Sequence, residues 1–116
     1  MSTELSQAYL ECALWSSIDV VDGMEVELDS VGNDLAPETR EQMEADCVKF
    51  EAENSTDLWE YGTQSQGGHD FWLTRNGHGA GFWEDDTPVG NRLTEACKAY
   101  GEYTLYIGDD GLIYGA

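Results

Sequence analysis

Apolar residues recur at helical spacing in three stretches of the chain. Residues 6–18 carry Leu10, Leu14 and Ile18 at intervals of four, which predicts a short helix. Residues 37–60 begin at a proline, a favourable first-turn residue, and predict a longer helix of roughly 36 Å. Its buried stripe is expected to consist of Met43, Cys47 and Phe50. A third helix is expected over residues 89–100, with its apolar side formed by Val89, Leu93, Ala96, Cys97 and Tyr100.

Two other stretches are typical of β-hairpins. Residues 70–83 contain Asn76-Gly77, a strong hairpin signal because both central positions of a type I′ turn need positive φ. Pairing outward from this turn places Phe71 opposite Phe82 on the core face and Trp72 opposite Gly81 on the outer face. A second hairpin is expected to join residues 102–107 to 112–114. Residues 24–31 also alternate, and fit either a short strand with one acidic face or an extended loop.

Together these elements predict an α+β fold in one domain of residues 1–116. Two N-terminal helices would precede a ββαββ unit, whose strands form a four-stranded antiparallel sheet with the helices on one face. The front, residues 1–61, would be acidic and mostly helical, and the back, residues 69–116, would carry most of the aromatic residues.

Charge is the most unusual property of the composition. The chain has 24 acidic and 5 basic residues, for a net charge of -19. Residues 1–60 hold 16 acids and 2 bases, so 14 of the 19 excess negative charges lie in the front half. Four Trp, six Tyr and three Phe argue against an acidic disordered tail, which would be poor in aromatic residues.

The same composition excludes several classes of protein. Five scattered bases are too few for direct nucleic-acid binding, because such sites need a cationic groove. No apolar run is long enough to cross a bilayer, and the N-terminus lacks the basic region of a signal peptide, so we expect a cytoplasmic protein. Cys12, Cys47 and Cys97 are odd in number and lack CxxC spacing, which favours buried, reduced thiols.

Candidate catalytic chemistry is weak, and we expect no cofactor and no enzyme. His69, Asp70 and His78 invite an interpretation as a small hydrolase or metal site, which stays an alternative. In the predicted hairpin, however, the two histidines are about six residues apart along the strands, or roughly 20 Å. Two imidazoles at that separation cannot bind one zinc ion or serve one substrate atom.

The acidic front has two interpretations. It is either a solvated surface that maintains solubility, or a mimic of nucleic-acid phosphates that binds a basic protein surface. B-DNA carries one charge per roughly 3.4 Å along each strand, a density that two acidic rows on one helix could approach. The candidate contacts are Glu41, Glu44, Glu51, Asp46, Glu53 and Asp57 on the long helix, with Glu25, Glu27 and Asp29 nearby.

Four segments of the chain form a distinctive pattern: AYLECALWSS, HDFWLTRNGHGAGFW, RLTEACKAYGE and LYIGDDGLIY. This pattern resembles that of a family of small uncharacterised proteins encoded by bacteriophages and prophages. The resemblance implies a phage origin, a bacterial host cytoplasm and, by analogy, an inhibitor of host defence such as a CRISPR effector or restriction enzyme. It implies no catalytic residue. A second alternative is an accessory protein of phage replication or recombination that binds through the aromatic hairpin, with Trp72 and Trp83 as its contacts.

Overall fold

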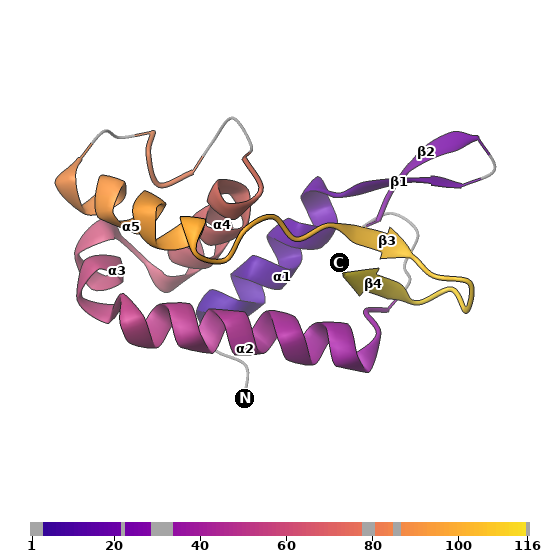
Figure 1. The fold of residues 1–116 in the computed structure, drawn as a ribbon, viewed down its shortest axis with the longest axis horizontal. Helices are drawn as coiled ribbons and strands as arrows, with labels where there is room; N and C mark the ends of the chain where they lie inside the picture. Colours follow the sequence, from indigo (N-terminus) through magenta and orange to yellow (C-terminus); the bar gives the residue numbers. More distant parts are fainter. Residues whose placement is uncertain (1–3, 22, 29–33, 78–80, 85–86, 116) are drawn as a thin grey trace.

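The computed structural model describes residues 4–21, 23–28, 34–77, 81–84 and 87–115, and most of these residues are helical. Five helices are present in this part of the chain: α1 (Glu4–Ser16), α2 (Pro37–Glu53), α3 (Ser55–Tyr61), α4 (Gln64–Arg75) and α5 (Pro88–Lys98). Two antiparallel hairpins accompany them, β1 (Ile18–Val21) with β2 (Met24–Glu27) and β3 (Leu105–Ile107) with β4 (Ile113–Gly115). Figure 1 shows both hairpins at one end of the molecule and α3 and α5 at the other.

The predicted four-stranded sheet is therefore wrong. Among the described residues, each sheet has two strands, and no ladder joins them. The predicted hairpin at residues 70–83 is replaced by α4, so Phe71 and Phe82 do not pair across strands, although both are buried. The proposed accessory function through an aromatic hairpin loses its structural basis with that hairpin.

The Asn76-Gly77 pair ends a helix instead of turning a hairpin. Asn76 is the C-cap of α4, and its side-chain amide donates to Trp72 O at 3.0 Å. Gly77 follows with φ +67°, the left-handed conformation that commonly terminates helices. Because a type I′ turn and a helix C-terminus both require positive φ, the same dipeptide satisfies either structure.

Two buried glycines explain why the helical period of α4 is hard to see. Gly67 and Gly68 lie on the side of α4 that packs against the core, at four-residue spacing from Phe71 and Trp72. A Cβ added to Gly68 would lie 2.0 Å from Leu5 O on α1. The glycines thus let α1 and α4 approach closely, whereas in a hydropathy pattern they resemble a loop.

The expected long helix is divided at Asn54. The Asn54 side chain and backbone N–H both donate to Phe50 O, at 2.9 and 3.0 Å, and its φ of -126° departs from helical geometry. The chain then continues as α3. With 17 residues, α2 is about 25 Å long rather than the roughly 36 Å expected for one helix over residues 37–60.

Several predicted elements are confirmed. Pro37 begins α2, and Met43, Cys47 and Phe50 are buried on it. The residue 89–100 helix appears as α5, with Leu93 and Cys97 buried. The terminal hairpin is present, and residues 24–27 form a strand, which settles that open interpretation for the described residues. All three cysteines are buried and free.

Aromatic rings from three helices, together with Phe82 and Tyr100 from the segments on either side of α5, form the centre of the core. The rings of Phe50 and Phe71 stack with centroids 4.0 Å apart, and Tyr9 and Tyr100 contact Phe71 at 5.0 and 5.1 Å. Phe82 packs on Phe50 from the segment between α4 and α5. This cluster joins α1, α2 and α4 and thereby fixes which side chains of each helix face outward.

Candidate interaction surfaces

The five basic side chains all contact groups of the protein itself. Arg40 lies 3.7 Å from Glu44, Lys98 lies 2.8 Å from Glu95, and Arg92 binds Asp57 at 2.9 Å. Arg75 binds Asp46 at 3.0 Å. Lys49 lies over the Tyr100 ring, 5.8 Å from its centroid. Each cation thus has an internal neighbour, and the large excess of carboxylates remains uncompensated.

Arg75 is a buried cation that joins α4 to the acidic helix α2. Its side chain is only 3% exposed, and it donates to Asp46 Oδ2, to the Tyr9 hydroxyl and to the carbonyls of Tyr100 and Gly101. Its guanidinium carbon also lies 5.3 to 5.7 Å from three aromatic centroids. Asp46 is therefore a partner of a buried cation rather than an available contact for another protein.

The candidate acids on α2 divide between two flanks of the helix. Glu44 and Asp46 are two residues apart, which places them about 200° apart around the axis. Asp46 and Glu53 lie on the flank near Arg75 and Tyr100, and Glu53 accepts a hydrogen bond from the Tyr100 hydroxyl at 3.2 Å. Glu41, Glu44 and Glu51 share the opposite flank, within about 80° of one another around the helix axis. We call this row the outer flank of α2. The two rows therefore do not form one surface.

The remaining acidic candidates lie on other elements than α2. Asp57, on α3, is bound by Arg92, whose Nε–H is shared between the two carboxylate oxygens and whose Nη2 donates to Oδ1. Glu25 is exposed on β2 and Glu27 ends that strand, while Asp29 lies outside the described residues. Figure 1 shows the β1–β2 hairpin projecting away from α2. Those of the predicted acids whose side chains the structure describes are thus distributed over several faces.

His69 and Asp70, the two described members of the histidine and aspartate candidates, lie in different surroundings. His69 is exposed and its ring lies 5.9 Å from that of Trp15. Asp70 is buried and accepts a hydrogen bond from the Tyr61 hydroxyl at 2.6 Å. His78 lies outside the described residues. Within the described ranges, no group of three His, Cys, Asp or Glu side chains is arranged to hold a metal ion.

The two tryptophans proposed as a secondary contact have different environments. Trp72 is 2% exposed and donates its indole N–H to Ser16 Oγ at 2.8 Å, so it belongs to the core. Trp83 is 44% exposed. The predicted pair is therefore reduced to one exposed ring.

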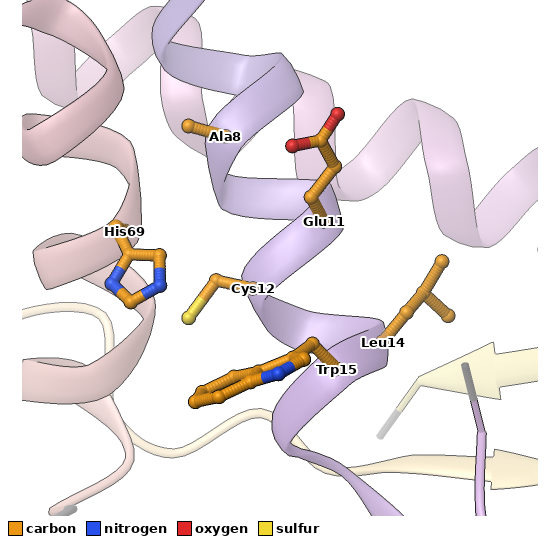
Figure 2. Close-up of a pocket in the computed structure, with 6 residues that line it drawn as sticks. All are labelled: Ala8, Glu11, Cys12, Leu14, Trp15 and His69. Atoms are coloured by element: carbon orange, nitrogen blue, oxygen red, sulfur yellow. The ribbon is translucent and has the colours of Figure 1, made fainter. Parts of the chain in front are cut away.

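A hollow of about 350 Å³ lies between α1 and α4 (Figure 2). The Trp15 ring, 61% exposed, extends across α1 toward His69 on α4, and the Cys12 thiol points into the space between them. Ala8, Glu11 and Leu14 complete the lining. The Glu11 carboxylate points away from the two rings in Figure 2.

The thiol in this hollow is unsuited to nucleophilic chemistry. Burial, together with the charge of Asp70, raises the pKa of Cys12 to about 12. A cysteine reacts as its thiolate, which is therefore scarce at neutral pH. The hollow offers aromatic and apolar contact surface rather than a reacting group.

A second hollow, of about 310 Å³, lies where α2, α3 and the start of α4 meet α1. Trp59 on α3 lines it and is 86% exposed, the highest exposure among the large apolar side chains described. Glu51, on the outer flank of α2, lines it as well. This hollow brings one candidate acid next to an exposed aromatic ring.

Trp59 and Trp15 were missed as surface residues by sequence reasoning, although a signal for Trp59 was present. A helix continued from Met43 places residue 59 about 160° from the buried stripe. Trp15 follows Leu14 in the apolar stretch of the first predicted helix, yet the buried side of α1 consists mainly of Leu5, Tyr9, Leu10, Cys12 and Ala13. Tryptophan on a predicted polar face is the feature that indicates a contact.

Comparison of the chain with protein-family models, with curated proteins and with solved structures finds no match. The resemblance to phage-encoded proteins therefore stays a prediction. None of the helices in the described part of the chain is long and apolar enough to cross a membrane.

Proposed function

We propose that this protein is a non-enzymatic inhibitor that occupies the basic nucleic-acid-binding surface of a partner protein. The resemblance to phage-encoded proteins suggests a partner in host defence, such as a CRISPR effector or a restriction enzyme, in the bacterial cytoplasm. The partner's lysines and arginines would meet carboxylates where they otherwise meet phosphates.

The observation that carries this proposal is the internal use of the cations. Arg75 and Arg92 bind Asp46 and Asp57, and the other three bases also contact groups of this chain. With a net charge of -19, the surface of the protein therefore repels nucleic acid and attracts a cationic protein surface.

The outer flank of α2 is the best candidate for the contact. Glu41, Glu44 and Glu51 share this flank and span ten residues, or about 15 Å along the axis. One strand of B-DNA carries about four charges over the same length. Arg40, 3.7 Å from Glu44 and 52% exposed on its side chain, is held too loosely to neutralise the row.

The proposal is tested by displacement of nucleic acid. A panel of purified CRISPR effectors and restriction enzymes is loaded with fluorescent DNA or RNA, and release is followed by anisotropy as the protein is added. We expect release from at least one member, weakening as salt rises. Substitution of Glu41, Glu44 and Glu51 together by Gln is expected to weaken it at least tenfold.

A matched variant separates a local surface from net charge. Three exposed acids outside α2 serve for this: Glu95 on α5, Glu102 after it and Asp109 between β3 and β4. Their replacement by Gln, Gln and Asn removes the same charge. This control is expected to retain most of the inhibition. Release from no member of the panel, or equal inhibition by the two triple variants, would show that phosphate mimicry by this flank is wrong.

A further inference from the structure

The hollow beside Glu51 and Trp59 combines two groups that recognise a cation. Its lining includes Glu51 and Trp59, with Leu5 and Leu58 as apolar contacts. The face of tryptophan is the most favourable aromatic surface for a cation. At about 310 Å³, the hollow is at the lower end of the roughly 300–1,000 Å³ typical of ligand sites, a size suited to a single side chain.

One oxygen of the Glu51 carboxylate lacks a donor among the described residues. Glu51 Oε2 is buried, and no described residue donates a hydrogen bond to it. A buried acceptor without a donor costs free energy, which a ligand that supplies an N–H recovers on binding. The terminal torsion of a glutamate is broad, so the carboxylate can turn either oxygen toward an incoming group.

Trp59 gives a second, independent indication of a ligand. It is 86% exposed, although Leu58, its neighbour in α3, is buried. The exposed Trp59 indole therefore lines the same hollow as Glu51, whose Oε2 needs a donor. A side chain with a flat face and several N–H groups could contact both.

We propose that this hollow receives an arginine side chain of the partner. A guanidinium is planar and weakly hydrated, stacks on aromatic rings and donates to a carboxylate in a bidentate manner. Lysine offers the charge without the plane, so it should bind more weakly. The net charge of -19 favours either cation over an acidic or neutral group.

This inference rests on the proposed function, because it identifies the anchor by which a basic nucleic-acid-binding surface is held. Arginine is common on such surfaces, where it binds phosphates. Aromatic and arginine contacts in partly enclosed pockets carry much of the energy of protein interfaces. Glu51 would then contribute more than the exposed Glu41, although both lie on the same flank.

The test uses N-acetyl-arginine amide as the probe and the Trp59 indole N–H resonance as the signal. The resonance is assigned from its loss in Trp59→Phe, and the probe is titrated to tens of millimolar. We expect a saturable shift with the arginine amide and a smaller one with N-acetyl-lysine amide. N-acetyl-citrulline amide, equal in shape but uncharged, should produce none. Glu51→Gln should weaken binding at least fivefold, whereas the control Glu41→Gln should not.

Glu51→Gln and the substitutions of Trp59 are expected to leave the fold unchanged. Gln has the shape of Glu, and Trp59 is nearly fully exposed, so circular dichroism and thermal unfolding should match the unsubstituted protein. Equal shifts with arginine and citrulline amides, or unchanged binding in Glu51→Gln, would overturn the arginine site.

The displacement assay separates this inference from the proposed function. If Glu51→Gln and Trp59→Ala each reduce inhibition more than Glu41→Gln and Trp83→Ala do, the anchor is supported. If inhibition occurs but these four variants are equivalent, the anchor is wrong and the mimicry stands. If the arginine amide binds but no nucleic acid is displaced from any panel member, the pocket stands and the proposed function fails.

Discussion

Arg75 Nη1 lies 3.0 Å from Asp46 Oδ2, and this ion pair joins α4 to α2 beneath the surface. The Arg75 side chain is 3% exposed and that of Asp46 is 17% exposed, so solvent screens the pair only weakly. The pair also explains why one of the candidate acids is unavailable to a partner.

Replacement of Asp46 by Ala should destabilise the fold by about 3 kcal/mol, because it leaves a buried guanidinium without its counter-charge. The remaining hydrogen bonds, to Tyr9 and to two backbone carbonyls, would moderate the loss. Urea unfolding followed by circular dichroism measures the change. Asp57→Ala is the matched control, since its partner Arg92 is 54% exposed and solvent screens the pair, so a clearly smaller loss is expected. Equal losses in the two variants would contradict a special role for the buried pair.

Gly68 is expected to be the least replaceable glycine in the contact between helices. In Gly68→Ala the new Cβ would lie 2.0 Å from Leu5 O, a backbone atom that cannot move without separating α1 from α4. We expect a loss of about 3 kcal/mol, the upper part of the range for overpacked cores. Urea unfolding of Gly77→Ala provides the comparison: its Cβ would meet open space, and only the φ of +67° opposes it, at a cost of about 1 kcal/mol. A Gly68→Ala protein as stable as Gly77→Ala would show that α1 and α4 are not closely packed there.

The glycines of α4 and of its C-terminus also show how far the sequence could predict the fold. Where large apolar residues recur, as at Met43, Cys47 and Phe50, periodicity alone identifies the helix and its buried side. In α4 the buried side begins with Gly67 and Gly68, whose contribution is close approach rather than apolar area, so hydropathy does not register it. Asn76-Gly77 then favours a hairpin and a helix end equally well, and only tertiary packing decides between them.

The candidate site was less predictable than the fold, for an electrostatic reason. Sequence shows how many carboxylates the chain has but not which of them face a cation. Asp46 and Glu44 are two residues apart, yet one binds a buried arginine and the other lies on the opposite flank. The Arg75 link to Asp46 spans 29 residues, a separation that no local pattern indicates.

Self-repulsion among the surface carboxylates should make the stability depend on salt. At a net charge of -19, raising NaCl from 10 to 300 mM should raise the unfolding temperature, because the Debye length falls from roughly 30 Å to below 10 Å. Differential scanning calorimetry measures the shift. The triple variant of Glu41, Glu44 and Glu51 to Gln should gain less from salt than the unsubstituted protein. An unfolding temperature that falls with salt would mean that attraction, rather than repulsion, dominates the surface.

The buried thiols should make the fold less stable in alkali. Burial raises the pKa of Cys12 and of Cys97 to about 12, from an ordinary value of 9.0. Between pH 9 and 12 the unfolded chain therefore loses these protons while the folded chain keeps them. Unfolding is favoured as pH rises, by about 1.4 kcal/mol per pH unit for each thiol that is ionised only when unfolded. Below pH 8 both states are protonated, and the thiols contribute no pH dependence.

Urea midpoints at pH 7.5, 9 and 10.5 test this expectation. The midpoint should change little over the first interval and fall over the second. Burial also raises the pKa of Tyr9, which acts in the same direction, so the fall should be shallower but still present in Cys97→Ala. Native protein at pH 8 should react with iodoacetamide far more slowly than protein in urea, because its thiols are both protonated and covered. Rapid labelling of Cys12 in the native protein would instead indicate that the hollow beside Trp15 opens to solvent and exposes the thiol.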